Sequence, residues 1–190
     1  LLLTAVLGTL LGIVATLRAG RPTDGAIGAV VLALNATPSF LLALVGIIVF
    51  SVHLRWLPLS GLAPPGRLPA EAPLETLRHL VLPVATLSLT TLALYVRVAR
   101  AAFVEMAASG HVVAARARGV GGFRLLRHHV VRPALTPVVT LLGLQASLML
   151  GGSVVVESVF AIPGFGSLAA AAVAQRDALL LAGVVVSGAV

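Results

Sequence analysis

The sequence predicts an all-α integral membrane protein, built as a polytopic bundle of helices, and three observations support this fold class. Hydrophobic residues make up 59% of the chain and charged residues only 10%, whereas a soluble domain has about 25% charged residues. The mean hydropathy is +1.10, so a chain folded in water would expose too much apolar surface. The apolar runs are long and continuous, which is typical of membrane helices and unlike the alternating ten-residue segments of a barrel.

Five apolar segments are each expected to form one membrane helix. They cover about residues 1–17, 26–52, 80–96, 135–156 and 178–190. A stretch rich in Pro and Gly, residues 53–79, is predicted to be an ordered loop between the second and third. The first segment begins at Leu1, and the last would reach only about 20 Å across a core of roughly 30 Å. We therefore expect a single transmembrane domain that lacks both of its ends.

The arginines predict which loops face the cytoplasm. All 13 basic residues are arginine. Loops 18–25 and 97–134 lie on one side of the expected topology, and they hold Arg18, Arg21, Arg97, Arg100, Arg116, Arg118, Arg124, Arg127 and Arg132. Loops 53–79 and 157–177 hold Arg55, Arg67, Arg78 and Arg176. Short loops rich in arginine remain cytoplasmic, so the stretch 97–134 is expected inside the cell.

The cytoplasmic loop 97–134 has features beyond its charge. It is far longer than a simple connection needs, and apolar residues recur in it at helical spacing. Gly119, Gly121 and Gly122 are expected to divide it into two short helices, because glycine is unfavourable inside a helix. The small residues Ala114 and Ala115 favour close approach of a partner protein over a helix lying on lipid. A role limited to fixing the topology is the simpler alternative.

The stretches "HVVAARARGV" and "RHHVVRPALTP" resemble the cytoplasmic signature loop of ABC-transporter permease subunits of the binding-protein-dependent importer class. The dipeptide, oligopeptide and nickel group is the most similar. Ala114, Ala115 and Gly119 match the pattern, and Pro133 and Pro137 match the prolines at its end. Val113 replaces the usual acidic residue. The segments "TPSFLLALVGIIVFSVHLRWLPLSG" and "GGSVVVESVFAIPGFGSL" resemble further parts of that group. The resemblance implies a MetI-like helical bundle whose first helix, and the end of whose last, lie outside this chain.

The resemblance implies a permease subunit that forms the path for peptides or similar small solutes. Residues 111–132 would be a coupling helix for a separate ATPase. The chain has no lysine and hence no phosphate loop, so ATP and Mg would be bound by that partner. The other implied partners are a second related permease, an extracytoplasmic substrate-binding protein and membrane lipid, with no nucleic acid. The implied location is the cytoplasmic (inner) membrane of a bacterium or archaeon. The coupling residues that we single out are Ala114, Ala115, Arg116, Gly119, Phe123, Arg127 and Pro133.

Two other function classes compete with this interpretation. A secondary transporter or channel subunit driven by an ion gradient would need ionisable residues in its spans, where Glu157 stands alone at the end of the fourth. An enzyme is not expected, because catalytic motifs and paired carboxylates are missing from the sequence, and no metal or catalytic residue is assigned. The candidate gate or path residues are Asn35, Pro38, Gln145, Ser147 and Glu157. For each, a kink, an interhelical hydrogen bond or a helix end is an equally good explanation.

Overall fold

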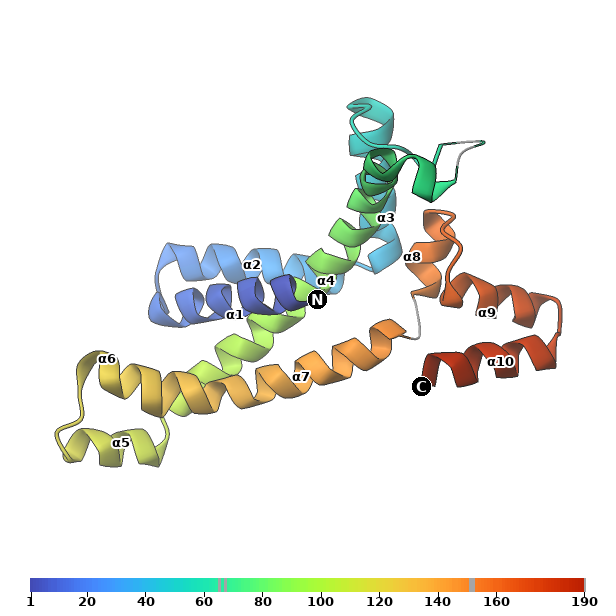
Figure 1. Ribbon diagram of the computed structural model, residues 1–190. Helices are drawn as coiled ribbons and strands as arrows, with labels where there is room; N and C mark the ends of the chain where they lie inside the picture. Colours follow the sequence, from blue (N-terminus) through green and yellow to red (C-terminus); the bar gives the residue numbers. More distant parts are fainter. Residues whose placement is uncertain (65, 67, 151–152, 190) are drawn as a thin grey trace. The chain divides into compact units, whose positions relative to one another are not determined.

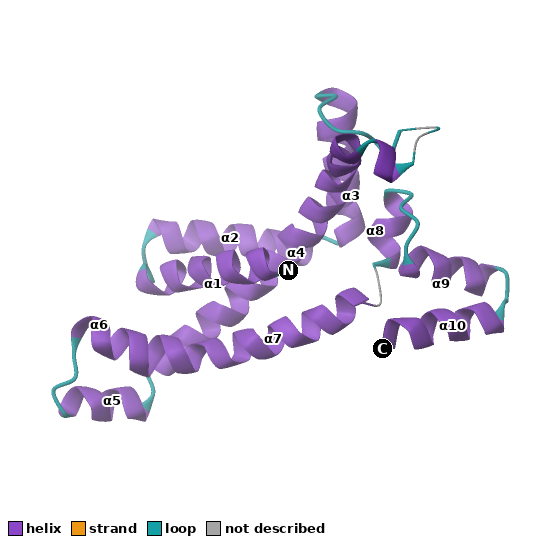
Figure 2. Ribbon diagram, in the orientation of Figure 1, coloured by secondary structure: helices purple, strands orange, loops and turns teal. Residues whose placement is uncertain are grey.

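A computed structural model describes all residues of the chain except 65, 67, 151–152 and 190. The described residues form helices and loops, with no strand among them (Figure 2). The predicted all-α class is therefore confirmed. The residues separate into two compact units, one made of Leu1–Ala36 and Leu89–Gln145 and the other of Thr37–Ser88 and Ala146–Val190. The expected segments 135–156 and 178–190 include positions outside the described residues.

The first unit contains two neighbouring apolar helices and the second half of a long one. They are α1 (Leu2–Leu17), α2 (Pro22–Ala36) and α4 (Pro73–Ala107) (Figure 1). After them come α5 (Gly110–Ala117), α6 (Gly122–Leu125), η3 (Leu126–Val131) and α7 (Arg132–Leu150), of which this unit holds the part up to Gln145. Gly8 and Gly12 of α1 lie directly against α4, where a Cβ on Gly8 would be 2.5 Å from the Cβ of Tyr95. Small residues four apart allow such close packing of membrane helices.

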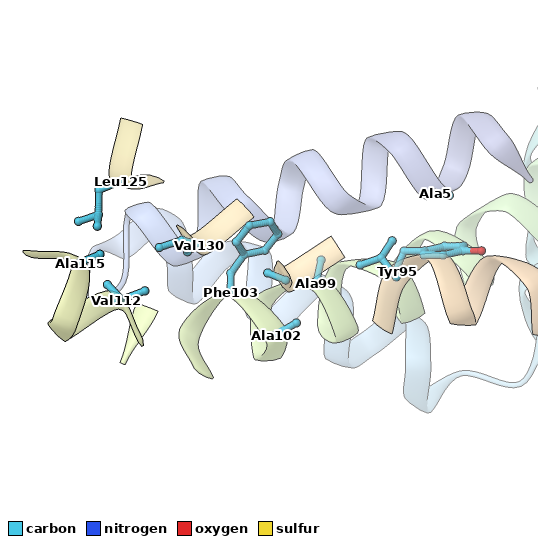
Figure 3. Packing of buried hydrophobic residues seen from close by; sticks show 11 residues of the cluster. Ala5, Tyr95, Ala99, Ala102, Phe103, Val112, Ala115, Leu125 and Val130 are labelled. Atoms are coloured by element: carbon cyan, nitrogen blue, oxygen red, sulfur yellow. The ribbon is translucent and has the colours of Figure 1, made fainter. Parts of the chain in front are cut away.

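Alanines fill much of the core of the first unit. Ala99 and Ala102 of α4 lie beside the buried Tyr95 and Phe103, and Figure 3 shows the two aromatic rings along the same helix. Val112 and Ala115 of α5 extend this cluster beyond the end of α4, where they meet Leu125 and Val130. Because alanine side chains are short, the helices that carry them can lie close together without voids. The core thus continues from the apolar helices into the arginine-rich stretch.

The second unit consists of shorter helices around a smaller core. They are α3 (Ser39–Gly46), η1 (Ile47–His53), η2 (Pro69–Glu71), the first half of α4, α8 (Val154–Val159), α9 (Phe165–Ala174) and α10 (Ala178–Ala189). Ala43, Leu82, Val156 and Phe160 form the buried cluster. The loop after η1 is fixed by hydrogen bonds, since Gly61 N donates to Phe160 O at 2.8 Å and His79 Nδ1 lies 3.0 Å from Ser60 O.

Helix bounds differ from the expected spans at several places, one of which is the expected segment 135–156, where α7 ends at Leu150 and α8 begins at Val154. Helix α4 runs from Pro73 to Ala107 rather than over 80–96, because hydropathy marks the apolar part of a helix and not its polar ends. The expected segment 26–52 is divided between α2 and α3–η1, and Pro38 precedes the first residue of α3 with φ −57° and ψ 142°. Within the described part of the chain, two helices are long and apolar enough to cross a membrane, α4 and Gly122–Met149, or three if the divided pair is one span.

Candidate functional site

The arginine-rich stretch folds into a helical hairpin, residues 110–131, which we call the basic hairpin. Helix α5 ends at Ala117, and Gly119 then adopts φ +81°. Gly119 N donates to Arg116 O at 2.9 Å and Val120 N donates to Ala115 O at 3.1 Å. These two bonds form a Schellman motif, which needs a left-handed residue at this position and so favours glycine. The predicted break at the glycines is confirmed, but only α5 is a short helix, because the helix that begins at Gly122 continues to Met149.

A side chain ties the two arms of the basic hairpin together. Nε2 of His111, in the first turn of α5, lies 2.8 Å from the carbonyl oxygen of His129 in η3. Pro133 has no N–H to donate to the carbonyl four residues before it, which is that of His129. His111 therefore supplies a side-chain partner to this oxygen. The local sequence around His111 contains no pattern that indicates a contact with residue 129.

The structure corrects the expected role of Ala115. Its side chain is fully buried, at 0% exposure, within the chain's own core. It therefore cannot present a close-approach surface to a partner protein. Figure 3 shows Ala115 and Val112 on the same side of α5 as the core residues Leu125 and Val130. Ala114, which precedes Ala115 in the matched motif, is exposed.

The outer face of the basic hairpin combines exposed apolar groups with positive charge. Phe123 is 73% exposed and Val113 is 58% exposed. Arg116 and Arg127 are exposed as well, and Pro133 is half-buried in the first turn of α7. Every titratable side chain between Met106 and Val156 is Arg or His. A large exposed aromatic residue surrounded by one sign of charge is typical of an interaction surface.

Glu157 has a structural role in the second unit. Its Oε1 accepts a hydrogen bond from Ser153 N at 2.9 Å and its Oε2 accepts one from Ser167 N at 2.7 Å. The carboxylate thus joins the first turns of α8 and α9. A Cβ on Gly164 would lie 2.5 Å from the Glu157 carboxylate, and one on Gly166 would lie 2.5 Å from Val154 N. Both glycines of "PGFG" are therefore needed, because a side chain at either position would be too close to the Glu157 carboxylate or to the backbone of Val154.

The other candidate path residues lie at separate places in the two units. Asn35 is exposed, donates to Val31 O at 2.9 Å, and lines a cavity of about 760 Å³ between α2 and α4. Gln145 is half-buried and Ser147 is exposed, both on α7. A contact that sequence reasoning missed is the ion pair of Arg100 with Asp24, at 2.8 Å, which ties α2 to α4. Among the described residues, no group of three His, Asp or Glu side chains is placed to hold a metal ion.

Ala114 and the buried Ala115 in α5, the left-handed Gly119 after this helix, and Pro133 in the first turn of α7 correspond to the sequence motif described above. The family model of the binding-protein-dependent transport system inner membrane component matches residues 8–190. The chain belongs to this family. It is therefore a multi-pass membrane protein of the permease class.

Relatives in this family carry names of transport permeases. A protein of Brucella ovis named as a peptide permease is 38% identical over 177 residues, 93% of this chain and 55% of the relative. A protein of Brucella abortus named as a peptide transport system permease is 35% identical over 92% of this chain and 54% of its own length. The glutathione transport system permease GsiC of Escherichia coli is 36% identical over 90% of this chain and 52% of its own length. The chain spans about half the length of these relatives.

Proposed function

We propose that this chain is part of a permease subunit of an ATP-driven importer in the cytoplasmic (inner) membrane of a prokaryote, and that it takes up peptides or similar small solutes. Membership of the importer family and the names of the relatives support this function. The proposed partners are a second, related permease, separate ATPase subunits that bind ATP and Mg, and an extracytoplasmic substrate-binding protein. The absence of lysine from this sequence is consistent with ATP binding on another chain.

The basic hairpin is the proposed contact with the ATPase. The observation that carries this assignment is the exposure of Phe123 and Val113 on a hairpin whose ionisable groups are all basic. In this arrangement Phe123 is the apolar anchor, and the arginines, Arg116 and Arg127 among them, are its charged rim. The internal packing of Val112 and Ala115 joins the hairpin to the end of α4. Movement of the hairpin would thereby be transmitted to a membrane helix as a rigid body.

Replacement of Phe123 tests this contact. In the complete transporter, Phe123→Ser should reduce co-purification of the ATPase by about tenfold or more, because a buried aromatic anchor contributes roughly 2 kcal/mol or more to an interface. Phe165→Ser is the matched control, since Phe165 is also exposed but lies on α9. Full retention of the ATPase together with normal uptake in Phe123→Ser would show that the hairpin is not the contact.

A further inference from the structure

An apolar cavity of about 780 Å³ lies beneath the basic hairpin, and Arg116 is the residue that it shares with the charged rim of the proposed ATPase contact. Its size is within the range of ligand sites, roughly 300–1,000 Å³. The walls come from the ends of α1 and α4, from the turn between α5 and α6, and from η3. The apolar side chains that line it include Ile13, Leu17, Phe103, Leu125, Leu126 and Val130.

The charged part of this lining is basic. Arg116 is the one charged side chain among the described lining residues. Glu105, which lies between Phe103 and Ala107 on α4, lines the other cavity of this unit instead. Arg18 and Arg21 follow the end of α1, and the next acidic residue after Glu105 in the sequence is Glu157. Asp24, which follows these arginines, is paired with Arg100. The charge in the cavity lining is therefore positive, which favours an anionic group.

The elements around the cavity place it at the boundary between hydrocarbon and headgroups. Ile13 and Leu17 lie in the last turns of α1, an apolar helix that is followed at once by Arg18. Arginine directly after an apolar helix is typical of the level of the lipid headgroups. A cavity with an apolar interior and a cationic opening at this level matches the polarity of a lipid that crosses the same boundary.

We infer that this cavity binds an anionic phospholipid. An acyl chain would lie among Leu17, Phe103 and Leu126, and the phosphate would accept charge-assisted hydrogen bonds from Arg116. The bound lipid would support the hairpin from its inner side, because the turn at Gly119–Gly122 forms one wall of the cavity. The proposed lipid contacts residues of this chain alone, so its binding does not require the ATPase.

Two pairs of variants test the inference: one changes the positive charge of the cavity lining, and the other changes the volume of the cavity. Arg116→Gln removes the proposed phosphate contact, and Arg118→Gln is its control, since Arg118 is exposed and does not line the cavity. Gly121→Leu fills the cavity without backbone strain, because Gly121 has φ −132° and a Cβ there meets nothing within 4 Å. Gly110→Leu is its control, since Gly110 also has open space but lies outside the lining.

The measurement is retention of lipid by the full-length permease complex, purified from nanodiscs that contain phosphatidylglycerol and phosphatidylcholine, by native mass spectrometry. The unaltered complex should retain phosphatidylglycerol preferentially. Arg116→Gln should lower its apparent affinity about fivefold, as expected for one basic residue near an anionic surface. Gly121→Leu should remove the bound lipid, and both control variants should behave as the unaltered complex.

Three outcomes would overturn the inference. They are equal retention of the two lipids, a full complement of phosphatidylglycerol in Gly121→Leu, and crosslinking of a photoreactive residue at position 126 to polypeptide instead of lipid. The last result would mean that a protein segment occupies the cavity. Because the readout is bound lipid, its failure leaves the Phe123 test of ATPase docking unaffected.

Discussion

Two glycines of α1 determine how closely this helix approaches α4. A Cβ at Gly8 would lie 2.5 Å from the Tyr95 Cβ, and a Cβ at Gly12 would lie 2.7 Å from the Ala99 Cβ. In lipid, helices associate through close packing and not through the hydrophobic effect, so any added bulk at these positions separates them. The spacing of four residues was readable in the sequence, but the facing residues on α4 were not.

Substitution of Gly12 should therefore destabilise the first unit. Gly12→Leu overpacks the contact with Ala99 and is expected to cost about 1–3 kcal/mol, seen as a lower midpoint of thermal unfolding in detergent. Gly28→Leu on α2 is the control, because a Cβ on Gly28 meets nothing within 4 Å. Equal midpoints for the two variants would argue against the close approach of α1 and α4.

Glu157 gives a second prediction at the level of single residues. Glu157→Ala leaves Ser153 N and Ser167 N without their acceptors, at a cost of about 1.5–3 kcal/mol for each bond to a charged group. The amide of Ser167 should then exchange its hydrogen much faster than in the unaltered protein. Glu157→Gln retains one acceptor oxygen and should give an intermediate rate. An unchanged rate in Glu157→Ala would contradict the bridging role.

Among the elements, the basic hairpin depends most on one backbone conformation. The Schellman turn requires the left-handed φ of +81° at Gly119, while the space around this residue is open. A side chain at position 119 would therefore strain the backbone without clashing with a neighbouring residue. The contact of His111 with His129 O then fixes the two arms at the far end from this turn.

Replacement of Gly119 should loosen the hairpin through strain alone. Gly119→Leu is expected to cost about 1–2 kcal/mol, the penalty of the left-handed conformation for an ordinary residue. The amide of Val120, which donates to Ala115 O, should lose protection from hydrogen exchange, and ATPase retention should fall. Gly119→Asn should be milder, because asparagine tolerates this conformation. Identical behaviour of the two variants would exclude strain as the cause.

For the whole molecule, the distribution of arginine predicts the orientation in the membrane. The loops expected inside the cell carry most of the 13 arginines, and short loops with an excess of arginine are retained in the cytoplasm. The exposed Ser60 and the exposed Ala117 lie on opposite sides in this topology. The chain has no cysteine, so introduced cysteines can be labelled without background.

Thiol labelling tests this orientation in intact cells. Ser60→Cys should react with an impermeant reagent, whereas Ala117→Cys should react only after the membrane is permeabilised. Labelling of position 117 from outside would reverse the topology. The permeabilised sample is the control, because it shows that position 117 is accessible when the membrane is no longer a barrier.

The sequence by itself determined the fold class, the helical division at Gly119 and the family. Composition decides between water and lipid as solvent, and a glycine that closes a helix acts within a few residues, so neither needs knowledge of distant contacts. Only the tertiary structure decided which face of α5 is buried. Apolar residues occupy consecutive positions from Val112 to Ala115, so periodicity alone does not select the inner side, and packing against Leu125 and Val130 does. The role of Glu157 was decided in the same way, because its partner Ser167 lies in another helix.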